Sequence, residues 1–67
     1  MRIIFTKHAL ERMQSRKITY QEVLGVACFP LYTIRRANQI IELMDDSLKV
    51  ISVKQGKILK IITVYKL

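Results

Sequence analysis

The chain has 67 residues and a formal net charge of +7, with twelve Lys and Arg against five Asp and Glu. This length fits one domain, taken as residues 1–67, and a hydrophobic content of 51% excludes a disordered chain. So short a chain buries only about 60% of its unfolded-state surface, which makes a homodimer or another protein partner an expected way to cover apolar surface. The charge favours polyanionic partners such as nucleic acid, although solvated lysines would also account for it.

Cysteine and histidine are too few for a disulfide or a cysteine-rich metal site. Cys28 is the single cysteine and His8 the single histidine, so we expect no bound metal and no cofactor. We expect Cys28 to be a small buried hydrophobe in a reducing, cytoplasmic setting. We also expect no signal peptide and no membrane partner, because no apolar run approaches the roughly 18 residues of a membrane span.

Two helices are predicted in the first half of the chain. Thr6 is suited to be the N-cap of a helix over residues 7–16. Thr19 and Glu22 have the spacing of a capping box, which predicts the start of a second helix. Pro30 disfavours helical geometry in the residue before it, so this helix is expected to end there.

The remaining elements are strands. Residues 1–5, "MRIIF", are either a short strand or an apolar lead-in, whereas "LYTIRRA", "IIELM", "LKVISVK" and "KILKIITVYKL" predict four strands. The segments "NQ", "DDS" and "QG" separate them, and Gly56 permits a tight hairpin turn. We therefore predict an α+β domain with two N-terminal helices packed on one face of a four-stranded antiparallel sheet. The other face is left partly apolar.

One row of polar residues marks the first helix. His8, Arg12 and Arg16 recur every four positions, which places them along a single helix face. Histidine can give or take a proton near neutral pH, and arginine forks match phosphate oxygens. These groups suit metal-free RNA cleavage, in which the neighbouring 2′-hydroxyl attacks the phosphate. An ordinary solvated helix face would show the same row.

Further cationic and aromatic candidates lie in the strands. Tyr65 in the last strand is suited to stack on a base or to donate a proton. Arg35 and Arg36 are expected to point to opposite faces of the sheet, so at most one of them joins a given site. Lys60 and Tyr65 also fall on opposite faces unless a β-bulge lies between them.

The stretches "FTKHALERMQSRKIT", "EVL" and "ITVYK" resemble the domain-of-unknown-function 4258 (DUF4258) family over essentially the whole chain. Members typically open with a His-Ala-x-x-Arg-x-x-x-Arg helix and end in a strand with Thr-x-Tyr. The matching positions here are His8, Ala9, Arg12, Arg16, Thr63 and Tyr65. Many members have glycine where Lys17 stands, which predicts a different geometry for the turn between the helices.

That family is similar to the RelE and BrnT toxins and other small RNases with two helices and four strands. The resemblance implies a metal-independent ribonuclease, often a toxin paired with a protein antitoxin. On this hypothesis His8 is the acid or base, Arg12 and Arg16 hold phosphate, and Tyr65 completes the site. The other candidates for nucleic-acid contact are Arg35, Arg36, Lys60 and Thr63. The alternatives are a non-catalytic nucleic-acid-binding module and a dimerising interaction protein.

Overall fold

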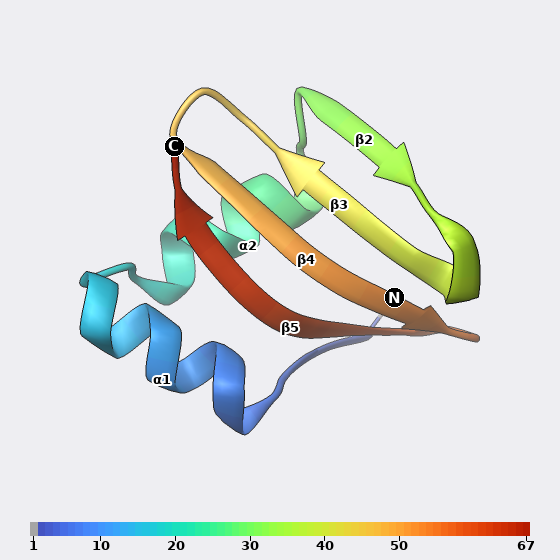
Figure 1. Ribbon diagram of the computed structural model, residues 1–67, viewed down its shortest axis with the longest axis horizontal. Helices are drawn as coiled ribbons and strands as arrows, with labels where there is room; N and C mark the ends of the chain where they lie inside the picture. Colours follow the sequence, from blue (N-terminus) through green and yellow to red (C-terminus); the bar gives the residue numbers. More distant parts are fainter. Residues whose placement is uncertain (1) are drawn as a thin grey trace.

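Two consecutive helices separate the first strand of the protein from all the others (Figure 1). The computed structural model describes residues 2–67. In chain order its elements are β1 (Arg2–Phe5), α1 (Lys7–Arg16), α2 (Tyr20–Cys28), β2 (Tyr32–Arg35), a 3-10 turn (Ala37–Gln39), β3 (Ile40–Met44), β4 (Leu48–Gln55) and β5 (Ile58–Lys66).

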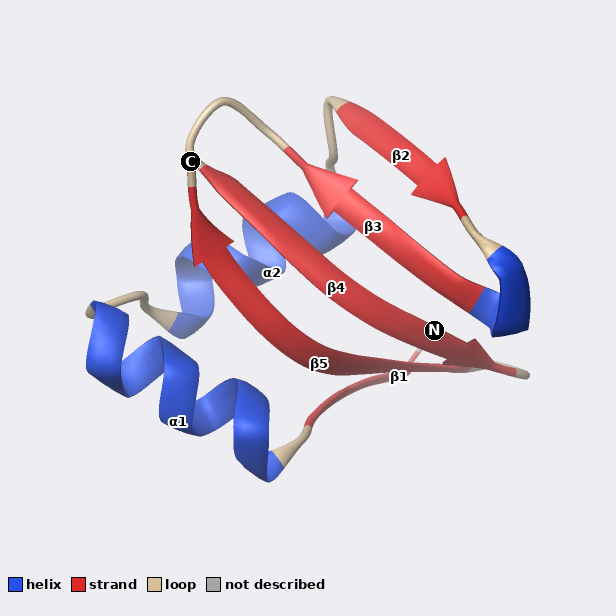
Figure 2. Cartoon of the chain, in the orientation of Figure 1, coloured by secondary structure: helices blue, strands red, loops and turns tan. Residues whose placement is uncertain are grey.

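The sheet is mixed and has one strand more than predicted. Within residues 2–67 it has five strands in the order β1-β5-β4-β3-β2 (Figure 2). β1 runs parallel to β5, whereas the other three pairs are antiparallel. The prediction of a four-stranded antiparallel sheet is therefore wrong, although the α+β class holds. A four-residue strand carries little local signal, and its partner lies at the other end of the chain.

Local side-chain hydrogen bonds fix where both helices start. Thr6 Oγ1 accepts a hydrogen bond from the backbone N–H of Ala9 at 3.2 Å, so the predicted N-cap is confirmed. The predicted capping box of Thr19 and Glu22 is also confirmed, with both reciprocal hydrogen bonds formed. α2 ends at Cys28, just before the proline segment, as predicted.

The hydrophobic core lies between the helices and one face of the sheet. α2 packs behind β3 and β4, and α1 runs along β5 (Figure 1). The helices and the turn between them contribute Ala9, Met13, Ile18, Val23 and Val26, and the strands contribute Ile41, Leu43, Leu48, Val50, Leu59, Ile61 and Val64. Because Val23 and Val26 take the buried positions of α2, Cys28 falls on its exposed side. The prediction that Cys28 is buried is wrong.

The turn between the helices has a backbone conformation that glycine favours, although the residue at that position is Lys17. Lys17 has φ 56° and ψ 45°, the left-handed conformation, and Ile18 donates a backbone hydrogen bond to the Met13 carbonyl at 2.8 Å. This arrangement is typical of a glycine-terminated helix. The prediction that Lys17 changes the turn geometry is therefore wrong. The hydrogen bonds that close the helix outweigh the steric cost of the lysine Cβ.

On the face of the sheet away from α2, a largely buried carboxylate lies between two cations. Glu42 is 7% exposed, forms an ion pair with Arg36, and has its Oε1 3.0 Å from Lys49 Nζ. Hydrogen bonds from Arg36 and then from Lys49 hold the pKa of Glu42 below its ordinary value of 4.5. These two pairs join β3 to β4 and to the segment after β2.

Replacing Lys17 with glycine should stabilise the protein. Glycine adopts the left-handed conformation without the Cβ penalty, so Lys17→Gly should raise the free energy of unfolding by about 0.5–1 kcal/mol. Urea denaturation monitored by circular dichroism measures this change. Lys17→Ala is the matched control, because it removes the same charge and keeps the strain. A glycine variant no more stable than the alanine variant would contradict this explanation of the turn.

The ion pairs of Glu42 should make stability depend on pH on the acid side. A folded-state pKa below the unfolded value means that this stabilisation is present above about pH 4.5 and is lost as the pH falls through the folded-state pKa. Glu42→Gln should therefore be less stable than the native protein at pH 7, and the difference should shrink below pH 4.5. Urea denaturation of both proteins between pH 7 and pH 3 measures it. A difference that does not change with pH would show that the carboxylate charge contributes nothing.

Candidate functional site

Arg16 connects α1 to the last strand. Its Nη1 donates a hydrogen bond to the Val64 carbonyl at 2.6 Å, and its guanidinium carbon lies 4.9 Å from the centre of the Tyr65 ring. β1 pairs with β5 only as far as Ile61, so the later part of this edge of β5 has no neighbouring strand. Arg16 supplies a hydrogen-bond donor to one carbonyl of this unpaired stretch of β5, and its guanidinium stacks on the face of the Tyr65 ring.

Thr6 makes the matching contact at the other end of α1. Its backbone N–H and its hydroxyl both donate to the Ile61 carbonyl, at 3.1 and 2.8 Å. α1 is thus fixed to β5 near both of its ends. Because α1 is fixed in this way, the row of His8, Arg12 and Arg16 has a defined position relative to the strand.

His8 and Arg12 form the second pair of the row. Arg12 Nε donates a hydrogen bond to His8 Nε2 at 3.3 Å, and both side chains are exposed. In this arrangement Nε2 is the unprotonated ring nitrogen, which is the form able to accept a proton. Eight residues of helix span about 12 Å, so His8 lies about that far along the axis from Arg16.

A β-bulge brings Lys60, Thr63 and Tyr65 to one face of the sheet. Their partners on β4 are Val53, Ile51 and Lys49, which alternate along that strand and so share a face. The register shifts where Ser52 pairs with Ile61 and Ile51 pairs with Thr63, which leaves Ile62 as the extra residue. The sequence left undecided whether a β-bulge lies between Lys60 and Tyr65, and the structure contains one. Thr63 is only 8% exposed and offers little of its surface to a ligand.

Sequence reasoning missed one residue next to the site. Lys49 of β4 lies directly opposite Tyr65, on the face that carries Lys60. Cross-strand neighbours of this kind become predictable only when the register of two strands is known, and the bulge at Ile62 makes this register irregular. Lys49 also forms an ion pair with Glu42, which partly neutralises the positive charge that it brings to this position.

Arg35 and Arg36 lie at the other edge of the sheet, away from the row on α1. β2 is the edge strand opposite β1. Arg35 is paired with Ile41, a core residue, whereas Arg36 forms an ion pair with Glu42 on the other face. The two arginines therefore point to opposite faces, as predicted. The structure does not bring them together with His8.

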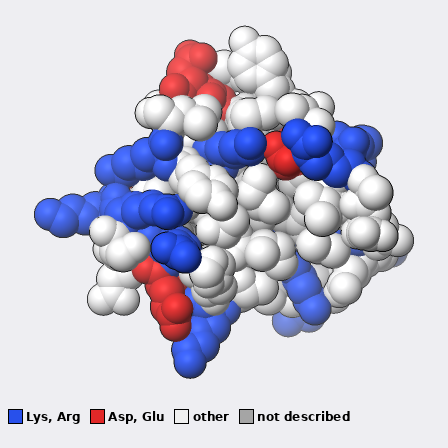
Figure 3. All heavy atoms as spheres, in the orientation of Figure 1, with Lys and Arg blue, Asp and Glu red and all other residues white. Residues whose placement is uncertain are grey.

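The surface charge is not confined to these two places. In the view of Figure 3, Lys and Arg side chains gather over α1 and the end of β5 and again near β2, and further charged side chains, basic and acidic, lie between the two groups. In the described part of the chain, no helix has the length and apolar character needed to cross a membrane. No group of three or more His, Cys, Asp or Glu in residues 2–67 is arranged to hold a metal ion.

Fold and surface together define a small, strongly basic α+β protein with a histidine-arginine row fixed beside its last strand. The family model described as "Domain of unknown function (DUF4258)" matches residues 5–66, and the chain belongs to this family. The resemblance to this family noted in the sequence is thus confirmed. No curated protein and no solved structure matches the chain. The similarity to the RelE and BrnT toxins stays a prediction.

Removing the Arg16 side chain should loosen α1 from β5. Arg16→Met keeps the aliphatic stem but leaves the Val64 carbonyl without its charged donor, so it should lower the free energy of unfolding by about 1–3 kcal/mol. Arg12→Met is the matched control, since Arg12 is exposed and, among the described residues, its side chain bonds only to His8. Thermal or urea denaturation compares the two. Equal effects of both changes would contradict the assigned role of Arg16.

Proposed function

We propose that this protein is a metal-independent ribonuclease of the RelE and BrnT kind, with His8 and Arg12 at its reactive centre. The observation that carries the proposal is the hydrogen bond from Arg12 to His8 Nε2 on an exposed helix face. The proposal takes the imidazole of His8 and the guanidinium of Arg12, which lie this close together, to act on one phosphodiester. The net charge of +7 supports a polyanionic substrate.

The reaction needs few protein groups because RNA supplies its own nucleophile. His8 Nε2 accepts the proton of the 2′-hydroxyl, whose oxygen attacks the adjacent phosphorus. Arg12 moves from His8 to the phosphate oxygens and stabilises the negative charge that develops on them. The P–O bond to the 5′-oxygen then breaks, and that oxygen takes a proton from water. The products are a 2′,3′-cyclic phosphate and a free 5′-hydroxyl.

The distance along α1 determines the role of Tyr65. Tyr65 stacks on the guanidinium of Arg16, whose backbone lies about 12 Å along the helix axis from that of His8. In the proposed mechanism Tyr65, a residue that is 41% exposed, stacks on a base next to the cleavage position rather than donating the proton to the leaving group. Lys49 and Lys60 on the same face add positive charge for neighbouring phosphates.

A non-catalytic nucleic-acid-binding module is the second candidate. Arg16 already donates to the Val64 carbonyl, so part of the predicted phosphate-binding row has a structural task. His8 is also the sole histidine of the chain. In a binding module the same surface would hold RNA through charge and stacking alone.

A protein partner, either an antitoxin or a second copy of the chain, would suit the edge of β2. Every residue of β2 is exposed there, and Phe29, Leu31 and Tyr32 are 83%, 61% and 61% exposed. Exposed apolar side chains beside an unpaired strand edge are typical of a protein contact.

Cleavage of single-stranded RNA in EDTA distinguishes the two main candidates. The native protein should release fragments with 2′,3′-cyclic phosphate ends, and His8→Ala should lower the rate at least tenfold at unchanged RNA affinity. Lys7→Ala is the neighbouring control and should retain the rate. RNA methylated at its 2′-hydroxyls should bind without being cut. Salt-sensitive binding without cleavage, unaffected by His8→Ala and weakened by Arg12→Ala, would instead establish the binding module.

A further inference from the structure

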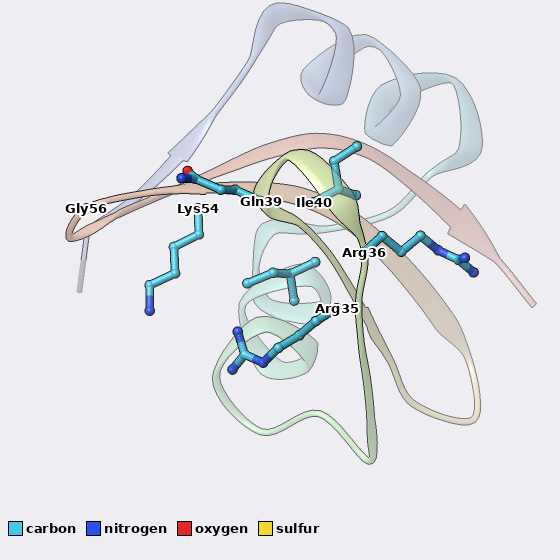
Figure 4. A pocket seen from close by; sticks show the side chains of 7 residues that line it. Arg35, Arg36, Gln39, Ile40, Lys54 and Gly56 are labelled. Atoms are coloured by element: carbon cyan, nitrogen blue, oxygen red, sulfur yellow. The ribbon is translucent and has the colours of Figure 1, made fainter.

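A hollow of about 500 Å³ lies at the end of the sheet where the β2–β3 connection meets the β4–β5 turn (Figure 4). Its lining residues are Arg35, Arg36, Gln39, Ile40, Ile41, Lys54 and Gly56. A smaller recess of about 140 Å³ adjoins it toward α2 and shares Arg35, Ile41 and Lys54 with it. The larger volume falls within the range of small-molecule sites.

Arg35 and Lys54 reach this hollow from the same face of the sheet. Arg35 pairs with Ile41, and Ile41 pairs with Ser52, two positions before Lys54 on β4. Residues two apart on a strand share a face. The backbones of Arg35 and Lys54 are thus separated by one intervening strand, and Figure 4 shows their side chains extending to the same side. Two long cationic side chains at this spacing can close on one anion.

The two cations have no acidic counterpart nearby. The ion pairs within residues 2–67 join Glu42 to Arg36 and to Lys49, and neither includes Arg35 or Lys54. None of the residues that line the hollow or its recess is Asp or Glu. An arginine and a lysine without a carboxylate beside them form a ready site for an anionic group.

The rim of the hollow is held in an uncommon backbone conformation. Asn38 and Gln39 have φ values of 61° and 63°, both in the left-handed region, although neither is glycine. Such conformations carry a steric cost and are found more often at binding sites than elsewhere. Here they place the Gln39 side chain on the rim, where its amide is available as a hydrogen-bond donor.

We propose that this hollow binds the phosphate of a nucleotide, held between Arg35 and Lys54, with the nucleoside against Ile41, which lies on the same face of the sheet. The planar fork of Arg35 takes two phosphate oxygens, Lys54 supplies a second positive charge, and Gln39 bonds the sugar or base. RNA is one source of such a nucleotide and a free nucleotide is the other. The site lies on a different edge from His8, so it holds whether or not the His8 row cleaves RNA.

Binding measured by backbone-amide NMR tests the site with uncleavable ligands. Uridine 5′-monophosphate, inorganic phosphate and a 2′-O-methyl oligonucleotide are each titrated into the full chain. The monophosphate or the oligonucleotide should shift the amides of Thr33, Ile41 and Lys54, whereas a response to inorganic phosphate alone would overturn the proposal of a nucleotide site. Arg35→Gln with Lys54→Gln should weaken the binding at least tenfold. His8→Ala should leave it unchanged, which separates this site from the proposed nuclease centre.

The matched control is Arg2→Gln with Lys17→Gln, which removes the same two charges outside the hollow. It should weaken binding less than threefold. For the oligonucleotide, loss of Arg35 and Lys54 should reduce the slope of log affinity against log salt by about 1.4, because two phosphate contacts are lost.

The three ligands separate the two sources of the nucleotide. Binding of the monophosphate identifies a site for free nucleotides, and binding of the oligonucleotide alone identifies a further contact for RNA. Shifts confined to other regions, or equal losses in the control and the test variant, would overturn the proposal. Spectra of both double variants that retain the native dispersion show that the fold is intact.

Discussion

The attachment of α1 to the edge of β5 is the constraint on which the candidate site depends. β1 pairs with the first half of β5 and stops at Phe5, where Thr6 turns the chain into α1 and bonds to the Ile61 carbonyl. From there the helix takes the place that a longer β1 would have occupied. Arg16 closes the same edge at Val64. The backbone polar groups along this edge of β5 are thus paired first with the backbone of β1 and then with the side chains of Thr6 and Arg16.

This arrangement has a direct effect on the chemistry of the helix. Of the row that recurs every four residues, Arg16 is fixed by the sheet, whereas His8 and Arg12 stay exposed and contact each other. The structural contact is therefore made by one member of the row, and the two residues proposed to react are those that it leaves free of the sheet. The bulge at Ile62 extends the surface, because it turns Lys60 and Tyr65 to the same side of the sheet. A regular strand would have separated them.

The sequence predicted those features that depend on neighbouring residues. The starts of both helices follow from Thr6 and Thr19, since a capping hydrogen bond spans only three residues. β3 has the predicted bounds, because turns border it on both sides. Of the predicted histidine-arginine row, Arg16 reaches Tyr65 of the last strand, whereas His8 contacts Arg12. The parallel pairing of β1, the bulge and the position of Lys49 depend on residues far apart in the chain, and no local pattern encodes them. The exposure of Cys28 was missed because neighbouring valines had already filled the core.

The parallel pair of β1 and β5 also has a consequence for the synthesis of the protein. The strand that holds α1 in place, β5, is synthesised after every other described element, whereas His8 and the arginines of α1 precede it by more than forty residues. A nascent chain that lacks residues 58–66 has neither the partner of β1 nor the carbonyls that bind Thr6 and Arg16. The candidate surface consequently forms only once β5 has been synthesised, so a nascent chain that stops before residue 58 has the histidine and the arginines but not their fixed arrangement.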